Sequence, residues 1–385
     1  MDPSDLRIAL FSGNYNYVRD GANQALNRLV AYLLDRGAKV RIYSPTVETP
    51  AFEPAGDLVS LPSVPIPGRR EYRFPLGLPS KVWRDLAAFG PNMVQISSPD
   101  IAAHRAVSWA RARNIPAVAS IHTRFETYLG YYHLQLLEPV LRAGLRRLYR
   151  RCDALLAPAE STAAVLRAQR MNGNIHIWAR GVDREQFNPG RRDMDWRRSL
   201  GIADDELAVA FLGRLVLEKG LDVFAASIAE LRRRKVPHHP LVIGGGPARA
   251  WFEQQMPSGV FVGHQVGEDL ARALASADVF LNPSITESFG NVTLESLASG
   301  VPVVAATATG TTNIVRNGET GVLVHPGDVA AFVEAIERYA LDPALRRRHA
   351  EAGVAYASTQ DWDDINASVL RVYENVIERR RSSSD

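Results

Sequence analysis

The sequence predicts an α/β protein made of two doubly wound domains, each organised around a parallel sheet. The chain has 385 residues, which is long for one domain and suits two domains of roughly 150–200 residues. Short apolar segments alternate with segments of helical periodicity, and this alternation starts again after a polar, irregular segment at 188–197. Two such series in succession are typical of two doubly wound domains with a cleft between them. We interpret 188–197 as the interdomain linker.

The first series opens with a strand at 7–11, a loop at 12–20 and a helix at about 21–36. Leu26, Leu29 and Leu33 recur at helical spacing in this helix. The segment 45–79 is dense in proline, which predicts short strands and a long excursion. Further strands are expected at 40–43, 93–97, 117–122, 154–157 and 175–178, and further helices from near 104 and 134.

The second series has a helix at about 220–234 after its first strand, and a long helical stretch at 362–381 follows its sheet. Its strands are expected at 207–212, 241–243, 260–262, 279–281, 301–305 and 322–324. We therefore predict a first domain at 1–190, a second domain at 191–361, and a terminal helix at 362–385 whose tail frays from residue 379.

Composition and charge indicate an ordinary globular protein, with 46% hydrophobic and 23% charged residues. The sequence has no run of about 18 apolar residues, so we expect no membrane-spanning helix. The opening MDPSDLRIALFSG predicts a strand and no signal peptide, so we expect a cytoplasmic protein. The single cysteine, Cys152, excludes an intrachain disulfide and offers no metal cluster. The net charge of +3 is modest, and no nucleic-acid partner is expected.

The segment 283–300, PSITESFGNVTLESLASG, is the most informative stretch for function. Apolar runs flank it on both sides, which predicts a strand, a loop, a helix and a second parallel strand. The loop carries Glu287, Ser288, Phe289, Gly290 and Asn291 to the carboxyl end of a strand, where open α/β sheets bind ligands. A glycine there permits close approach of a ligand to the backbone, and the N–H groups of a helix's first turn suit a phosphate.

A second glutamate, Glu295, lies eight residues after Glu287, on the predicted helix. Eight helical residues span roughly 12 Å, which matches the reach of a nucleotide sugar from hexose to ribose. A surface helix with two solvated glutamates is the alternative. Glu-x7-Glu, followed by ASGVPVVAA and GETGVLVHPGD, resembles the donor-site signature of the family-4 retaining glycosyltransferases.

This resemblance covers most of the chain and is strongest at 213–328. It implies the GT-B architecture, in which two Rossmann-like domains face a central cleft and a C-terminal helix crosses back to the first domain. It also implies roles for the two glutamates: Glu287 positions the donor hexose, and Glu295 binds the ribose hydroxyls.

The segment FLGRLVLEKG follows a predicted strand and supplies two cations on one loop. Gly213 permits a tight turn, while Arg214 and Lys219 suit a pyrophosphate whose negative charge grows as it leaves. The resemblance implies the same contacts. A salt-bridged surface loop is the alternative.

The remaining site candidates depend more on the resemblance. It places His122 beside the donor hexose, although a histidine at a strand end is often structural. It places Gly21 near the diphosphate, but the usual second glycine is an alanine here. Arg180, in an RGVD segment, is expected to face the cleft, or to pair with Asp183. The other candidates are His264, in a segment that reads the nucleobase, and Gly245, in a glycine turn that lacks the G-x-G-x-x-G spacing.

The segment 128–151 mixes tyrosines, leucines and five arginines. Apolar residues recur at helical spacing, at Leu137, Val140, Leu141, Leu145 and Leu148. One interpretation is a helix that faces the core and has a basic solvent face. The other is an interfacial helix that docks on anionic lipid and presents a lipid acceptor, with arginines at 69, 70 and 73 extending the basic surface.

We therefore predict a retaining glycosyltransferase, nearest to bacterial enzymes that transfer mannosyl, glucosyl or sulfoquinovosyl groups to glycolipids. It moves a hexose from a nucleotide diphosphate sugar to a hydroxyl of a membrane lipid or glycan, in the cytoplasm or on the inner face of the membrane. No metal or other cofactor is expected, because cations and helix termini replace it. A nucleotide-sugar epimerase of the same architecture and a non-catalytic binding protein are the alternatives.

Overall fold

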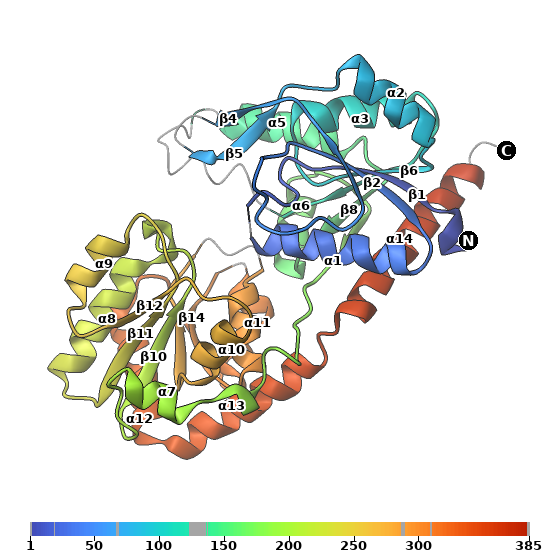
Figure 1. The fold of residues 1–385 in the computed structure, drawn as a ribbon. Coiled ribbons are helices and arrows are strands. Elements are labelled where there is room, and N and C mark those ends of the chain that lie inside the picture. The colour runs from blue at the N-terminus through green and yellow to red at the C-terminus, as the bar shows by residue number, and fades with distance from the viewer. Residues whose placement is uncertain are drawn as a thin grey trace. The chain divides into compact units, whose positions relative to one another are not determined.

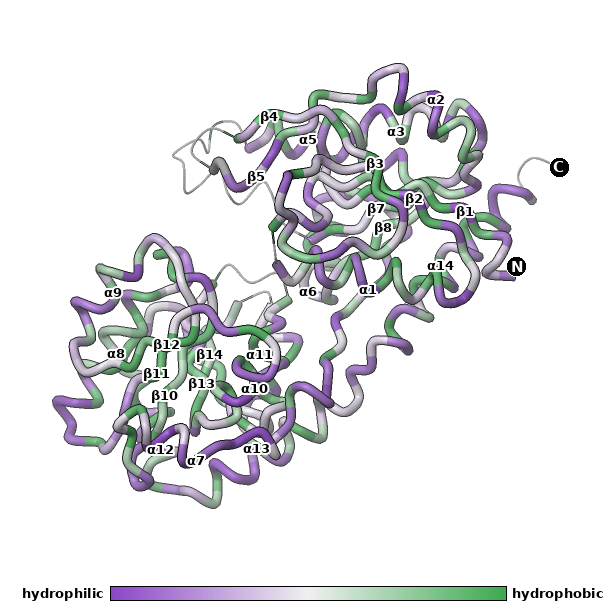
Figure 2. Tube along the Cα trace, in the orientation of Figure 1, coloured by the Kyte–Doolittle hydropathy of each residue, from purple (hydrophilic) through white to green (hydrophobic). Residues whose placement is uncertain are grey.

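The computed structural model describes residues 2–18, 20–66, 69–122, 136, 138–285, 289–308 and 310–382. Its contacts divide the chain into two α/β units, shown in Figure 1. Unit 1 comprises Met1–Ala179 and Asp363–Asp385, and unit 2 comprises Arg180–Trp362. Figure 2 shows that hydrophobic residues concentrate along the strands of both sheets, while loops and outer helical turns are mostly hydrophilic.

Unit 1 contains a seven-stranded parallel sheet in the order β3-β2-β1-β6-β7-β8-β9. Its strands are β1 (Arg7–Phe11), β2 (Lys39–Ser44), β3 (Asp57–Ser60), β6 (Met93–Ile96), β7 (Ala117–Ser120), β8 (Ala154–Ala157) and β9 (Ile175–Ile177). The excursion forms a separate antiparallel pair, β4 (Ser63–Ile66) and β5 (Arg69–Pro75). Its helices are α1 (Gly21–Asp35), α2 (Ser80–Phe89), α3 (Ile101–Arg111), α5 (Glu138–Tyr149), α6 (Glu160–Ala168) and most of α14 (Trp362–Ser382).

Burial and capping explain why the unit 1 elements form where they do. Every residue of β6, β7 and β8 is buried, as expected for parallel strands that are covered on both faces. Helix α1 begins after Asp20, whose carboxylate accepts a hydrogen bond from the Asn23 amide at 2.9 Å. Asp100 caps α3 in the same way, so that helix begins at Ile101, before the predicted position near 104. The start predicted near 134 lies outside the described residues.

The predicted return of the last helix to the first unit is confirmed. Tyr373 of α14 is completely buried in unit 1, and its hydroxyl donates to the Gln95 Oε1 at 2.6 Å. The prediction of a frayed tail from 379 is wrong in part, because α14 continues to Ser382. The Arg380 Nε donates to the Asp153 Oδ1 at 2.9 Å, which holds this last turn against the unit.

Unit 2 contains a six-stranded parallel sheet in the order β12-β11-β10-β13-β14-β15. Its strands are β10 (Leu207–Leu212), β11 (His238–Ile243), β12 (Val260–Gly263), β13 (Val279–Asn282), β14 (Val303–Ala306) and β15 (Gly321–Val324). Its helices are α7 (Met194–Ser199), α8 (Leu221–Arg233), α9 (Arg249–Gln255), α10 (Gly267–Ala275), α11 (Asn291–Ala298), α12 (Val329–Leu341) and α13 (Pro343–Ser358). Strand β10 lies between β11 and β13, so the chain order reverses at β10 and β13.

The first boundary lies between residues 179 and 180, earlier than the predicted 190 and 191. The Val182 amide donates to the Gln360 carbonyl at 3.1 Å, and a Cβ on Gly181 would lie 2.7 Å from the Trp362 ring. These contacts attach residues 181 and 182 to unit 2. They also place Trp362, the first residue of α14, in unit 2.

The interpretation of 188–197 as a linker is wrong. The segment forms a 3-10 turn at Pro189–Arg191 and the start of α7, both in unit 2. Arg197 is 1% exposed and pairs with Asp278 at 2.6 Å, while Arg192 pairs with the same carboxylate at 2.7 Å. The segment is polar because it binds a buried carboxylate.

Candidate functional site

The candidate site lies at the carboxyl edge of the unit 2 sheet. Because the strands are parallel, the loops that follow them emerge at one edge, and ligands bind where the chain order reverses. That position is between β10 and β13, which pair side by side. The loop after β10 holds residues 213–220, and the loop after β13 holds residues 283–290. We call this region the switch-point site.

A glycine turn packs against the first of these loops. The Gly213 amide donates to the Ile243 carbonyl at 3.0 Å, and the Leu215 amide donates to the Gly245 carbonyl at 2.9 Å. A Cβ on Gly244, whose φ is +145°, would lie 1.9 Å from the Gly213 carbonyl oxygen. The two loops can therefore pair only because residue 244 is glycine.

Of the two predicted cations, Arg214 precedes a short 3-10 turn, Leu217–Lys219, and Lys219 is the last residue of that turn. Arg214 is exposed and Lys219 is half-buried. Gly220 follows with φ +73°, and a Cβ there would lie 2.9 Å from the Pro283 carbonyl oxygen. The cationic loop is therefore packed against the loop after β13.

Helix α11 begins directly after that second loop. Its N-cap residue, Gly290, has φ +97° and no side chain, and no described side chain caps the helix. Below it, the Asn282 Nδ2 donates to the Thr293 Oγ1 at 3.1 Å, which ties β13 to the helix. The N–H groups of the first turn give this end of α11 a partial positive charge that suits a phosphate. Phe289 is buried beside it.

The outward face of α11 carries the predicted ribose ligand. Asn291 and Glu295 are one turn apart and both half-buried, whereas Thr293, Leu294, Ser296 and Leu297 are buried. Glu287 and Ser288, predicted to contact the hexose and the phosphate, lie outside the described residues. His264 is exposed immediately after β12, the edge strand of the sheet.

Two predicted residues lie at the carboxyl edge of the unit 1 sheet. The strand predicted at 117–122 ends at Ser120, so His122 is in the loop that follows β7. Its Nε2 lies 3.1 Å from the Ser120 Oγ, and its ring meets the Trp178 ring edge-on, with centroids 5.4 Å apart. Gly21 is the first residue of α1.

The N-terminus of α1 beside Gly21 does not offer its amide groups freely to an anion, because the Asp20 carboxylate already accepts a hydrogen bond there. Burial raises the pKa of Asp20, and hydrogen bonds from the Asn23 and Ala22 amides lower it by less. A diphosphate at Gly21 would therefore lie next to a carboxyl group. Arg180, predicted to face the cleft, is 3% exposed, and burial lowers the pKa of its guanidinium to about 10, so the side chain stays charged at neutral pH.

The structure thus brings together most of the predicted donor residues: Gly213, Arg214, Lys219, Gly245, Phe289, Gly290, Asn291 and Glu295. Sequence reasoning gave no role to Gly220 and Asn282, which also shape the site, and it kept the glycine turn that contains Gly244 only as a secondary candidate. Gly220 had a signal, since it stands between a cationic loop and a predicted helix. Asn282 had none, because a strand-end asparagine is common.

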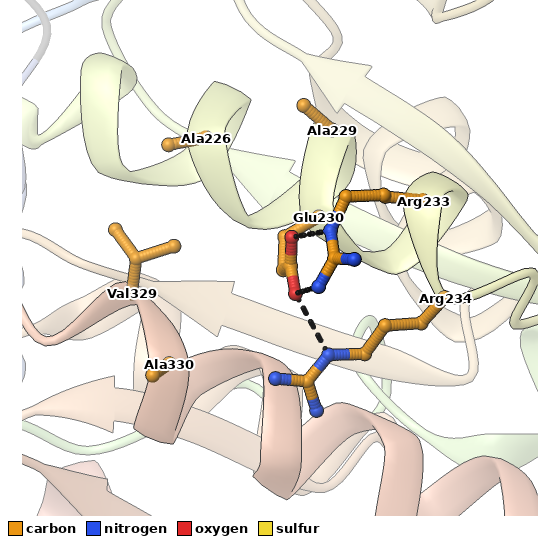
Figure 3. A pocket seen from close by; sticks show the side chains of 7 residues that line it. All are labelled: Ala226, Ala229, Glu230, Arg233, Arg234, Val329 and Ala330. Atoms are coloured by element: carbon orange, nitrogen blue, oxygen red, sulfur yellow. Dashed lines mark hydrogen bonds and ion pairs between the residues drawn. The ribbon is translucent and has the colours of Figure 1, made fainter.

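A separate pocket lies between α8 and α12 and is shown in Figure 3, lined by Ala226, Ala229, Glu230, Arg233, Arg234, Val329 and Ala330. Its charges are paired. The Glu230 carboxylate accepts from Arg233 at 2.7 Å and from Arg234 at 2.9 Å, and these bonds lower its pKa to about 2. None of the predicted site residues lines this pocket, so we do not assign it to the substrate.

The two doubly wound units, with a glycine turn, two cations and the start of helix α11 at the switch point of unit 2, agree with the fold class predicted from the sequence. Residues 19–186 match the model described as Glycosyltransferase Family 4, and residues 206–342 match the model described as Glycosyl transferases group 1. The chain belongs to this glycosyltransferase family. None of the helices in the described part of the chain has the length and hydrophobicity needed to span a bilayer.

Curated relatives extend over nearly the whole chain. A GDP-mannose-dependent alpha-mannosyltransferase of Mycobacterium tuberculosis is 30% identical over 98% of this chain and 99% of its own length. Sulfoquinovosyl transferase SQD2 of Arabidopsis thaliana is 30% identical over 94% of this chain and 73% of its own length.

Solved structures confirm the fold. Sucrose-phosphate synthase from Thermosynechococcus elongatus superposes with a TM-score of 0.79 at 21% identity, covering 97% of this chain and 100% of that one. Anabaena HepE in complex with UDP superposes with a TM-score of 0.76 at 18% identity, covering 96% and 100%.

Proposed function

We propose that this chain is a retaining glycosyltransferase that moves a hexose from a nucleotide diphosphate sugar to a hydroxyl of a membrane lipid or lipid-linked glycan. The switch-point site carries the proposal: two cations, a helix terminus that no described side chain caps and an outward glutamate lie along one sheet edge. The proposed donors are GDP-mannose and UDP-glucose or UDP-glucuronate. The name of the mycobacterial relative, a GDP-mannose-dependent mannosyltransferase, supports the first, and the name of the Arabidopsis relative supports transfer of a sulfoquinovosyl group.

The diphosphate is the group that this site would hold. Arg214 and Lys219 would bind its oxygens, and the first turn of α11 would add N–H groups aimed at the same charge. When the bond between the anomeric carbon of the hexose and the diphosphate oxygen breaks, negative charge grows on the departing nucleoside diphosphate, and fixed cations stabilise that charge. On this proposal no metal is required, and chelation by EDTA should leave the rate unchanged.

The sugar and nucleoside ends of the donor would be held by the two glutamates. Glu295 would bind the ribose hydroxyls from the outward face of α11, next to Asn291. Glu287 would hold the hexose hydroxyls, and His122 of unit 1 would complete the hexose pocket. Retention would follow from attack of the acceptor on the same face that the diphosphate leaves.

The acceptor is proposed from the surface of α5. The C-terminal half of this helix packs in the core through Leu145, Leu148 and Tyr149. Its N-terminal half exposes 71% of Val140, and Arg147 and Arg150 are exposed farther along. The interpretation of a helix that faces the core holds for the C-terminal half. We propose the interfacial interpretation for the N-terminal half. An exposed apolar residue beside arginines suits the interface of an anionic membrane, and residues 123–135 of the same segment lie outside the described residues.

A variant of Val140 tests the membrane part of the proposal. Val140→Glu should reduce co-sedimentation with vesicles of anionic lipid, because a carboxylate is repelled by the lipid charge. Leu341→Glu, which adds the same charge at an 81% exposed apolar residue of unit 2, is the control and should bind the vesicles as the wild type does. Equal binding of wild type and Val140→Glu would remove α5 from the proposal.

The decisive experiment measures donor consumption with and without acceptor. The purified chain is incubated with GDP-mannose, UDP-glucose or UDP-glucuronate and a lipid extract, and the product's anomeric configuration is read by NMR. Acceptor-dependent release of nucleotide with retained configuration is expected. Conversion of the donor into an epimeric sugar without acceptor would identify an epimerase. Donor binding without any turnover would identify a binding protein.

The site assignment has its own test. Lys219→Ala should lower kcat/KM at least about tenfold, since loss of one charge-assisted contact in the transition state is worth about 1.4 kcal/mol or more. Lys235→Ala is the control, because Lys235 lies past the far end of α8 and away from the switch-point site. A near-wild-type rate for Lys219→Ala would exclude it from the diphosphate site.

A further inference from the structure

We propose that helix α14 sets the tautomer and orientation of His122 through two buried hydrogen-bonded arms, which makes Tyr373 and Asn366 positioning residues for the hexose pocket. The functional consequence rests on the proposed function, in which His122 contacts the donor hexose. The arms themselves are contacts within unit 1 and do not depend on that function.

The first arm runs from α14 across two strands. The Tyr373 hydroxyl donates to the Gln95 Oε1 at 2.6 Å, and the Gln95 Nε2 donates to the Ser120 Oγ at 3.4 Å. The Ser120 Oγ then lies 3.1 Å from the His122 Nε2. Tyr373, Gln95 and Ser120 are all at most 3% exposed, so solvent does not replace these partners.

The donors along this arm select one protonation state of His122. A tyrosine hydroxyl that donates to Oε1 turns the Gln95 amide nitrogen toward Ser120. The single Ser120 proton goes to the Ile96 carbonyl at 3.3 Å, which can only accept. Both lone pairs of the Ser120 oxygen then accept, from Gln95 and from His122. With the Ser120 proton on the Ile96 carbonyl, we assign the proton of the neutral imidazole to Nε2, so that Nδ1 is its acceptor nitrogen.

The second arm holds the ring from its side. The Trp178 ring meets the imidazole at an interplanar angle of 73°, with centroids 5.4 Å apart, an arrangement that favours edge-to-face contact. The Trp178 Nε1 donates to the Asn366 Oδ1 of α14 at 3.4 Å. Both side chains are 1% exposed.

The two arms share one face of α14. Asn366 and Tyr373 are two helical turns apart, so they project from the same side of the helix. Their polar groups are buried, and a buried polar group needs a partner. The returning helix therefore binds unit 1 by the same hydrogen bonds that orient His122, and a displaced helix would release the ring.

The experiment reads the tautomer directly, by long-range proton–nitrogen NMR of protein labelled with 15N-histidine. The wild type should show a proton on Nε2 of His122, and Tyr373→Phe should show a mixture of the two tautomers. Tyr43→Phe is the matched control, since Tyr43 is completely buried in the same unit and donates to the Asp85 Oδ2 at 2.8 Å. It should leave the His122 signals unchanged.

Two results would overturn the proposal: a proton on Nδ1 in the wild type, or identical His122 signals in Tyr373→Phe and the wild type. The first needs no variant, so the proposal stays testable even if Tyr373→Phe fails to fold. Transfer activity is a separate readout. Under the proposed function, Tyr373→Phe should lower kcat about tenfold with KM changed less than about twofold. An altered tautomer with unaltered kcat would support the positioning and refute the role of His122 in the reaction.

Discussion

Arg197→Met should destabilise unit 2 by about 3 kcal/mol, which tests whether the segment at 188–197 is part of that unit. The Arg197 and Asp278 charges are 2.6 Å apart, and Arg197 is 1% exposed. At an effective dielectric constant of about 20 their attraction is roughly 6 kcal/mol before desolvation is subtracted. Removing one partner of a buried pair costs about 3–5 kcal/mol. In this variant Asp278 would keep its ion pair with Arg192 at 2.7 Å and its hydrogen bond from the Ala208 amide at 2.9 Å. We therefore expect a loss of stability at the lower limit of that range.

Asp278→Asn should cost more, about 5 kcal/mol, because it leaves the Arg197 guanidinium buried without its counter-charge. Arg198→Met is the matched control. Arg198 is 53% exposed and pairs with Asp195 and Asp204 at the surface, so its loss should cost less than about 1 kcal/mol. Urea unfolding, with hydrogen exchange of the β13 amides reporting on unit 2, measures all three. Equal free energies of unfolding for Arg197→Met and Arg198→Met would refute the reasoning.

The pH dependence of the same pair has a defined sign. Burial raises the pKa of Asp278, but Arg192, Arg197 and the Ala208 amide outweigh burial, so the pKa in the folded state is lowered. The stability that the carboxylate contributes is therefore complete above its unfolded pKa of about 3.9 and is lost as the pH falls through the lowered value. The difference in stability between wild type and Asp278→Asn should shrink below about pH 4. A constant difference from pH 7 to pH 3 would contradict this sign.

Two further predictions concern the switch-point site. Glu295→Ala should weaken nucleotide binding about tenfold or more, as measured by calorimetry, because under the proposed function this carboxylate accepts hydrogen bonds from the ribose hydroxyls; unchanged affinity would count against the ribose assignment. Gly244→Ala should lower the free energy of unfolding of unit 2 by at least about 2 kcal/mol, because a Cβ at φ +145° would lie 1.9 Å from the Gly213 oxygen. Gly245→Ala, whose Cβ would meet nothing within 4 Å, is the control, and equal stability of the two variants would contradict the packing argument.

The strands and most helices could be predicted from the sequence because their signals are local. The apolar runs at Arg7–Phe11, Ala154–Ala157 and Leu207–Leu212 are strands with the predicted bounds. The segment around α11 also forms the predicted strand, loop, helix and parallel strand. That Arg214, Lys219, Gly290 and Glu295 lie at one edge of the sheet could be predicted for the same reason, since they belong to two short motifs that each follow a strand.

The mistakes concern polar residues whose role depends on the partner that they bind. The arginines of 188–197 have the composition of a linker, and only the position of Asp278, about 80 residues away, shows that Arg197 is buried. Asp20 is likewise an ordinary helix cap in sequence. The structure shows that its carboxyl group occupies the helix end at which a diphosphate was expected, next to Gly21.

By itself, the sequence determined the fold class, the strand positions and the family, because apolar periodicity and short motifs depend only on neighbouring residues. Only the tertiary structure shows that β10 and β13 pair at the switch point and that Gly244 allows two loops to pack together. It also shows that the Tyr373 hydroxyl donates a hydrogen bond to Gln95, which is 278 residues away in the sequence. Such pairings depend on which distant surfaces pack together, and a buried polar group shows its role only once its partner is in place.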